Sequence, residues 1–395
     1  MKRAIGICLV FLSAAALLPA QDAQKILDTF RRNFAIASLD VKIQILQDAA
    51  AGKTAASMGP LFQQAVDFVN DNASLIPTDA RFNQLAAIGA EQIGVAGYTI
   101  GKESVWKLFT ATRDSVTLVK AATSLGVIGV GDADIVSNLN RYADAQNSLF
   151  SAGQTPDLAV VVACFKALGA IGDASSFPLL FTAMNLGYPE RVAAVARAAL
   201  LSLKGDFKEM LTGVMRTRPV AEKKIALQMA IDTDKLNDQQ KADFCELALD
   251  IGLHSGVSES STRGVLRDIR FTAAAALGAR KWSHATGLLI EHLDVSIGEF
   301  DKSLVDRNHL LDAIGDVGAM NTHEAAVRLT QFLVLINSYT EKGKVYDDQL
   351  VFAVLQNLGV LGDKVAFDDL MYTQYLNYST EVKKAARAAL EKVKW

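Results

Sequence analysis

Histidines and acidic residues are the residues of this sequence best suited to acid–base chemistry or metal binding. The five histidines lie between His254 and His323, and none has the HxH or HExxH spacing that brings two imidazoles to one metal ion. His309 and Asp312, three residues apart on one predicted helix face, are the best candidate for one edge of a metal site. We favour the simpler alternative of a solvated helix pair, so the sequence predicts no metal ligand.

Neighbouring acidic residues also lack a catalytic context. Pairs such as Asp132 with Asp134 and Asp368 with Asp369 come at the starts of predicted helices. There the helix dipole favours negative charge, which gives these residues a structural purpose. The chain contains neither a GxSxG sequence nor a phosphate-binding GxxxxGK[ST] sequence. The sequence therefore predicts no catalytic residue and no cofactor.

A repeated phrase marks the elements that position these residues. It is Leu-Gly-Val-Ile-Gly at 125–129, Leu-Gly-Ala-Ile-Gly-Asp at 168–173 and Leu-Gly-Val-Leu-Gly-Asp at 358–363. Each copy closes an apolar stretch of helical periodicity and is followed by a second such stretch. The last glycine suits the left-handed residue that ends a helix, and Asp173 and Asp363 are placed to cap the next one. Repeated helix–turn–helix units predict a solenoid.

Apolar spacing and helix breakers predict a series of antiparallel helix pairs. The pairs are 24–50 with 57–71, 79–93 with 102–112, 115–129 with 133–149, 157–171 with 174–186, 189–204 with 206–216, 219–233 with 238–252, 266–280 with 283–294, 304–317 with 322–337, and 347–361 with 364–376. A last helix at 380–394 is predicted to cap the array, and Asn321 with Glu324 has the spacing of a capping box. The expected fold is all-α, a solenoid or superhelix of about eight to nine antiparallel helix pairs with a terminal capping helix.

The N-terminus has the pattern of an export signal. Two basic residues precede an uncharged run from Ala4 to Leu18, which is followed by Ala20. The run has fifteen residues, fewer than the roughly 20 that a helix needs to span a bilayer. We expect 1–20 to be a signal peptide and the mature chain to be periplasmic or secreted, with no membrane span. A leader retained as a membrane anchor is the alternative.

The composition argues against a nucleic-acid partner. Among 395 residues, 43 are Asp or Glu and 40 are Lys or Arg, so the chain lacks the basic excess that displaces phosphate counterions. The mature chain has two cysteines, Cys164 and Cys245, in predicted helix interiors of different repeats. A disulfide needs Cα atoms within about 7 Å, so we favour buried free thiols over a bridge.

Three segments carry a resemblance to a known family. They are Ile269-Arg270 followed by Ala273 to Gly278, Arg191 to Leu200, and Lys384 to Leu390. Each has a basic residue, an alanine-rich face and a leucine before a turn. In these features the chain resembles HEAT-repeat proteins, in particular the phycobilisome-lyase-like HEAT subtype, as an exported bacterial member.

The resemblance covers the chain unevenly. It is clear at 115–216 and 266–395, whereas other parts share only the rhythm of helix pairs. We therefore expect divergent N-terminal helical repeats at 21–112 and a HEAT-like repeat array at 113–395, with a flexible insertion near 253–264.

The expected function is binding without catalysis. Repeat arrays bind along the surface of their second helices, and Tyr372, Tyr375 and Tyr378 recur there every three residues. We expect this patch to contact a protein or peptide partner in the cell envelope; two core tyrosines and one ordinary surface tyrosine are an equally supported alternative. The resemblance also implies two rival functions. A HEAT-like enzyme of the lyase or hydroxylase type is one, although the His-Glu metal pairs of the hydroxylases are missing, and nucleic-acid binding is the less favoured other.

Overall fold

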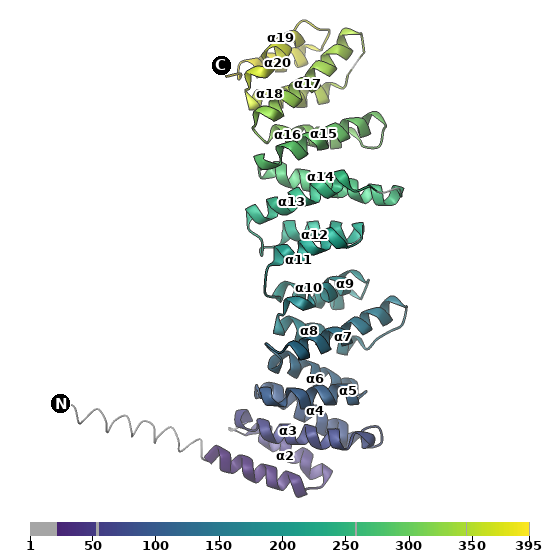
Figure 1. Ribbon diagram of the computed structural model, residues 1–395, viewed down its shortest axis with the longest axis vertical. Coiled ribbons are helices and arrows are strands. Elements are labelled where there is room, and N and C mark those ends of the chain that lie inside the picture. The colour runs from purple at the N-terminus through teal and green to yellow at the C-terminus, as the bar shows by residue number, and fades with distance from the viewer. Residues whose placement is uncertain (1–21, 53–54, 257–258, 345, 395) are drawn as a thin grey trace, which may run out of the picture. The chain divides into compact units, whose positions relative to one another are not determined.

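The computed structural model describes residues 22–394, apart from 53–54, 257–258 and 345. Within these residues all regular secondary structure is helical, and consecutive helices pack as antiparallel pairs (Figure 1). This arrangement confirms the all-α solenoid that the sequence predicts. The expected signal peptide at 1–20 lies outside the described residues.

The helices form two compact units, residues 1–205 (unit 1) and 206–395 (unit 2). In unit 1 a helix at 22–36 is followed by α2 (Leu39–Ala51), α3 (Gly59–Asp71), α4 (Ala80–Val95), α5 (Lys102–Ala111), α6 (Ser115–Ile128), α7 (Ala133–Ser151), α8 (Leu158–Ile171), α9 (Phe177–Asn185) and α10 (Glu190–Ser202). Unit 2 contains α11 (Phe207–Thr217), α12 (Val220–Asp232), α13 (Asp238–His254), α14 (Ser260–Ala279), α15 (Thr286–Asp301), α16 (Arg307–Gly318), α17 (His323–Glu341), α18 (Asp348–Leu361), α19 (Phe367–Thr373) and α20 (Thr380–Leu390). The expected boundary at 112 falls inside unit 1, where α6 packs on both α4 and α5.

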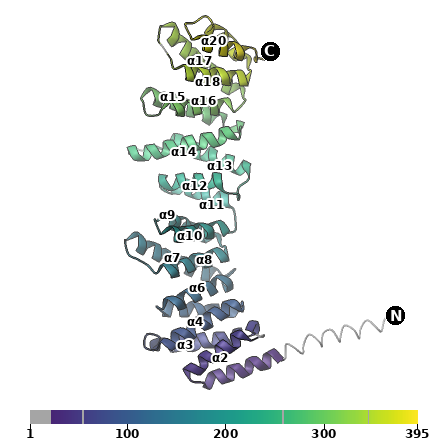
Figure 2. The same ribbon diagram turned by 180° about the vertical axis from the view of Figure 1, so that it is seen from behind.

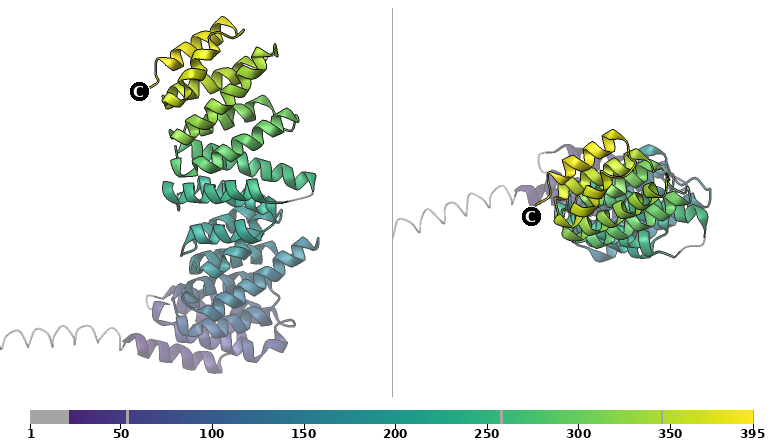
Figure 3. Two further views of the ribbon diagram at one scale, coloured as in Figure 1. Left: turned by 45° about the horizontal axis from the view of Figure 1, so that its top comes forward. Right: turned by 90° about the horizontal axis from the view of Figure 1, so that it is seen from above.

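Each unit has two layers of helices. In unit 1 one layer runs through α2, α4, α6, α8 and α10, and in unit 2 the matching layer runs through α12, α14, α16, α18 and α20. The odd-numbered helices form the other layer. Figures 1 and 2, which show opposite sides, let the reader follow how odd-numbered and even-numbered helices alternate along each unit. The left view of Figure 3 shows the successive pairs within each unit. Helix α20 ends the first layer of unit 2 by packing on α18 and α19.

The turn after the repeated phrase has the predicted chemistry in two copies. Gly172 and Gly362 end α8 and α18 with φ of 76° and 61°, a left-handed conformation that costs glycine little. The carboxylates of Asp173 and Asp363 then accept hydrogen bonds from backbone N–H groups two residues on. In the 125–129 copy Gly129 has φ −90°, and the positive φ moves to Gly131.

The first glycine of the phrase allows neighbouring helices to approach closely. A β-carbon on Gly126 would lie 2.7 Å from the Cα of Ala167, and one on Gly169 would lie 2.8 Å from the Cα of Ala199. Real β-carbons do not come so near a backbone atom, so only glycine lets α6 meet α8 and α8 meet α10 at this separation. The phrase therefore encodes packing between repeats as well as the turn.

The end of each unit repeats the same internal contacts, 190 positions apart. Asn147 accepts a hydrogen bond from the hydroxyl of Tyr188 at 3.2 Å, and Asn337 accepts one from Tyr378 at 3.0 Å. The backbone N–H of Lys204 donates to the carbonyl of Gly172 at 2.8 Å, and Lys394 donates to Gly362 at the same distance. We call residues 133–204 and 323–394 the two matched segments.

The first predicted helix, 24–50, is wrong because it is two helices. The chain leaves helical geometry at Ala37 and Ser38 before α2 begins. The side chain of Lys42 crosses this break: its Nζ donates to the carbonyls of Phe34 and Ala35 and lies 4.5 Å from the Phe34 ring centroid. Lysine thus satisfies the last carbonyls of one helix from the next, and its burial lowers the pKa of Lys42.

The predicted capping box at Asn321 is also wrong. Asn321 has φ 54° and precedes the cap, while the Thr322 hydroxyl accepts from the backbone N–H of Ala325 and caps α17. Asparagine tolerates the left-handed region better than most residues, which suits it to the turn before the helix.

The expected insertion near 253–264 is largely helical where it is described. Helix α13 continues to His254, and α14 begins at Ser260, six residues before its predicted start. Val257 and Ser258 lie outside the described residues.

The two cysteines are buried in helix interiors, as expected. Burial raises the pKa of the Cys164 thiol to about 12 and that of Cys245 to about 11, so both thiols stay protonated at neutral pH.

Candidate binding site

The three tyrosines of the expected binding patch lie in different environments. Tyr372 is in α19 with 41% of its surface exposed, and Tyr375 follows the helix with 77% exposed. Tyr378 is half-buried, and its hydroxyl donates to Asn337 of α17. Tyr378 therefore connects the segment after α19 to α17, whereas the rings of Tyr372 and Tyr375 remain accessible.

The matched segment of unit 1 shows which tyrosines the fold requires. Tyr188 stands at the position of Tyr378 and makes the same hydrogen bond to an asparagine. Thr182 and Asn185 stand at the positions of Tyr372 and Tyr375. Because the same helix pair forms with a threonine and an asparagine there, packing does not demand aromatic rings at these two positions.

The surface around Tyr372 is more apolar than its counterpart. In unit 1, Asp144 and Thr182 line one hollow of about 400 Å³ between α7 and α9. The matching residues of unit 2 are Val334, which is exposed, and Tyr372. Met371, the residue before Tyr372, is also exposed, and a hydrogen bond from the Tyr372 hydroxyl to Glu341 raises the pKa of Tyr372. We call Val334, Met371, Tyr372 and Tyr375 the tyrosine surface.

The histidines pair with carboxylates, but not as the sequence suggested. His309 contacts the α16 capping residue Asp306 at 2.7 Å rather than Asp312. Three other histidines bridge neighbouring helices to acids: His254 to Glu291 at 2.9 Å, His284 to Glu246 at 2.7 Å and His323 to Asp363 at 2.7 Å. The hydrogen bonds raise the pKa of His284 and His323, and that of His254 is raised first by a further contact of its Nδ1 with Asp250 at 2.9 Å and then by the charge of Glu291.

His292 is the exception among the histidines. It is fully buried in α15, and neither ring nitrogen has a hydrogen-bond partner among the described residues. Burial and the nearby charge of Arg270 lower the pKa of His292 to about 3, so the ring is neutral. No group of three or more His, Cys, Asp or Glu side chains in the described part of the chain is arranged to hold a metal ion.

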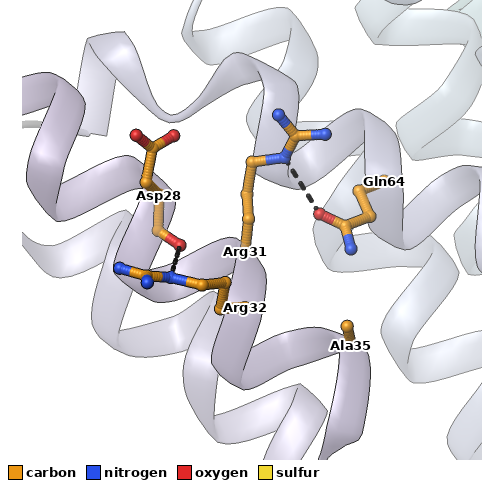
Figure 4. Close-up of a pocket in the computed structure, with 5 residues that line it drawn as sticks. All are labelled: Asp28, Arg31, Arg32, Ala35 and Gln64. Atoms are coloured by element: carbon orange, nitrogen blue, oxygen red, sulfur yellow. Dashed lines mark hydrogen bonds between the residues drawn. The ribbon is translucent and has the colours of Figure 1, made fainter.

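Two hollows with arginines were not predicted from the sequence. One in unit 1 has a volume of about 520 Å³ and lies between the 22–36 helix and α3. Figure 4 shows Arg31 reaching Gln64 and Arg32 turned back to the Asp28 carbonyl, with N–O distances of 3.1 and 3.2 Å. Both arginines and Asp28 are exposed, so this hollow holds its charges in contact with solvent.

The second hollow, in unit 2, is lined by arginines of α14. Arg263, Arg267 and Arg270 lie four and three residues apart, which places them on one helix face. That spacing is visible in the sequence. The expectation of a flexible insertion near 253–264 hid it, because Arg263 then belonged to no helix.

The chain matches no family model and no curated protein sequence. No helix among the described residues combines the length and apolar character needed to cross a membrane.

Proposed function

We propose that this chain is a HEAT-like repeat protein that binds a protein or peptide partner in the bacterial cell envelope. The observation that carries the proposal is the exposure of Tyr372 and Tyr375 at positions where the matched segment has Thr182 and Asn185. The leader-like pattern at 1–20 supports export, and the alanine-rich helices with a basic residue support the HEAT resemblance.

The tyrosine surface has the character of a protein-binding surface. Tyrosine is enriched at interfaces because its ring buries a large apolar area while its hydroxyl keeps a hydrogen bond. Val334 and Met371 add exposed apolar area, and Glu341 beside Tyr372 offers an acceptor for a basic residue. The partner segment that fits presents an apolar side chain next to a lysine or arginine.

Non-catalytic binding is favoured over the enzyme alternative. The histidines that contact acids do so at separate places: His309 at the start of its own helix, His284 and His323 each with one acid of a neighbouring repeat, and His254 between two acids. Such contacts cap a helix or join neighbouring helices, which is a structural role.

The proposal can be tested by exchanging surface residues between the matched segments. The double variant Tyr372→Thr and Tyr375→Asn carries the residues that unit 1 already accommodates, so we expect it to fold. Used as bait against a cell-envelope fraction, it should lose captured partners by about tenfold or more, since a buried interface tyrosine contributes about 2 kcal/mol. Mass spectrometry of the captured proteins provides the measurement.

Two controls accompany this test. Tyr378→Phe removes only the hydroxyl that faces Asn337 and should leave capture unchanged. Thr182→Ala with Asn185→Ala changes the matched positions of unit 1 and should also leave it unchanged. Capture of the same proteins in the same amounts by the double tyrosine variant would refute the tyrosine surface as the binding site.

A further inference from the structure

The arginine-lined hollow of unit 2 is a cavity enclosed by three consecutive helices. It has a volume of about 330 Å³ and lies between the end of α13, one face of α14 and the C-terminal part of α15. Arg263, Arg267 and Arg270 line it on successive turns of α14. Its volume falls within the range of cavities that hold small organic ligands. We call it the arginine hollow.

The charges around the arginine hollow do not balance. Among the lining residues, Glu299 of α15 is the one carboxylate. Its two oxygens are already shared, one with Arg267 at 3.0 Å and the other with Arg270. Arg263 is exposed and makes no ion pair with any described residue. Three guanidinium groups therefore face one carboxylate.

Arg270 provides independent evidence that an acceptor is missing. Only 4% of its side chain is exposed, and its Nε has no hydrogen-bond partner among the described residues. Leaving a buried charged donor without an acceptor is costly, so this Nε calls for an acceptor that the described residues do not supply. The neighbouring ring of His292 is neutral, so it adds no further positive charge beside Arg270.

We propose that the arginine hollow binds a small organic oxyanion, a carboxylate or phosphate that carries a compact apolar group. Guanidinium forks match both head groups in geometry and charge. The hydroxyls of Ser255 and Ser260 line the same hollow and can donate to the remaining oxygens. Leu266 and Leu304 supply apolar walls for the rest of the ligand.

This site is separate from the tyrosine surface. The two share no residue, so the oxyanion site does not depend on the proposed function and can be tested separately from it. Variants in one are expected to leave the other unchanged.

Calorimetric titration of the purified chain with three probes tests the proposal. N-acetyl-leucine presents a carboxylate, isopentyl phosphate presents a phosphate, and N-acetyl-leucinamide has the same apolar group without a charge. We expect at least one charged probe to bind with one site per chain, and the neutral amide to bind at least tenfold more weakly. The charged probe that binds more tightly identifies the head group. Absence of binding by both charged probes, or equal binding of the amide, would overturn the proposal.

Substitutions locate the site. Arg263→Gln removes a guanidinium that makes no ion pair with a described residue, so we expect normal folding and binding of the charged probe weakened by about tenfold. Arg267→Gln should weaken it at least as much. Arg307→Gln removes one positive charge from α16 outside the arginine hollow and is the matched control. If Arg263→Gln and Arg307→Gln bind the probe as tightly as the unaltered chain, the ligand is bound elsewhere and the inference is wrong.

Discussion

The two matched segments, 133–204 and 323–394, share their internal contacts and differ on their surfaces. Both keep the left-handed glycine, the capping aspartate and the tyrosine–asparagine hydrogen bond. They differ where side chains meet solvent: Thr182 against Tyr372, and Ala133 against His323. The shared residues thus identify what the fold requires, and the differing ones are free to serve binding or regulation.

The comparison extends to the helix before each matched segment. In α6, Ser124 packs against Gly94 of α4, and in α16, Asp316 packs against Gly278 of α14. The carboxylate of Asp316 is mostly buried, and its Oδ2 has no hydrogen-bond partner among the described residues. Burial, and secondarily the charge of Asp312, raise the pKa of Asp316 to about 7. Unit 2 thus places an ionisable group against a glycine of the preceding even-numbered helix, whereas unit 1 places a hydroxyl in a contact of the same kind.

The largest expected effect tests the shared helix packing. Gly169→Val should destabilise the chain by about 3 kcal/mol, because its β-carbon would fall 2.8 Å from the Cα of Ala199. Gly359→Val should cost about 2 kcal/mol, since the corresponding distance to Ala389 is 3.1 Å. Urea denaturation measures both. Gly213→Val is the control, because a β-carbon there meets nothing within 4 Å; equal losses at all three positions would mean that the close approach is unimportant.

The next effect tests the difference at Asp316. A carboxyl whose pKa rises on folding stabilises the fold at low pH, and this contribution is lost as pH rises from about 4 to the folded value near 7. Asp316→Ser replaces the carboxyl with a hydroxyl, the group that Ser124 presents to Gly94. Its free energy of unfolding should therefore rise, relative to the unaltered chain, by roughly 2–3 kcal/mol more at pH 8 than at pH 5. Denaturation at the two pH values measures this gain.

The exposed neighbour Asp312 provides the control for that measurement. Asp312→Ser removes only the smaller cause of the shift and should give a much smaller pH-dependent gain. A gain for Asp316→Ser that is the same at both pH values would contradict the assignment of a raised pKa.

A smaller effect tests the tyrosine–asparagine contacts. Tyr188→Phe leaves the Oδ1 of Asn147 without its donor and should cost about 1–2 kcal/mol. Tyr378→Phe should cost less than about 1 kcal/mol. The Thr373 hydroxyl, which has the Asp369 carbonyl as its nearer acceptor at 2.8 Å, also lies 3.3 Å from Asn337 Oδ1 and can turn to replace the lost donor. Thermal denaturation of the two variants shows which one loses more stability. A greater loss of stability for Tyr378→Phe than for Tyr188→Phe would show that Thr373 does not compensate.

The sequence predicted the features that depend on local signals. Leucine–glycine phrases and aspartate caps act within one turn of the chain, so most helices begin and end near their predicted positions. Contacts between residues far apart in sequence were missed. The tyrosine–asparagine hydrogen bonds join residues 41 positions apart. The first glycine of each phrase is required by close contact with a helix that comes later in the sequence.

Two errors arose where packing overrides local preference. The apolar spacing of 24–50 continues through Ala37 and Ser38, so nothing in the periodicity marked the break that Lys42 closes. The serine-rich start of α14 has weak helix propensity, yet it is helical from Ser260. That second error concealed the arginine face, whereas the tyrosines of the candidate surface were found because they stand out by type alone.

The smallest expected effect concerns His323, which replaces Ala133 of the other matched segment. Its hydrogen bond to Asp363, followed by the attraction of that charge, raises the pKa of His323. A histidine whose pKa rises on folding stabilises the fold below its ordinary pKa of about 6.5, and the contribution is lost as pH rises through the folded value. His323→Ala should therefore lower the melting temperature at pH 5.5 and leave it unchanged at pH 8.5.

The matched segments provide an internal control for this prediction. Asp363→Asn keeps a side-chain oxygen for the cap but removes the charge that attracts His323, whereas Asp173→Asn makes the same change opposite Ala133. We expect Asp363→Asn to lower the melting temperature more at pH 5.5 than at pH 8.5, because the stabilising pair with charged His323 is lost. Asp173→Asn should change the melting temperature by the same amount at both pH values. If both asparagine variants show the same pH dependence, the contact between His323 and Asp363 does not stabilise unit 2. The two matched segments would then differ in sequence at this position without differing in how their stability depends on pH.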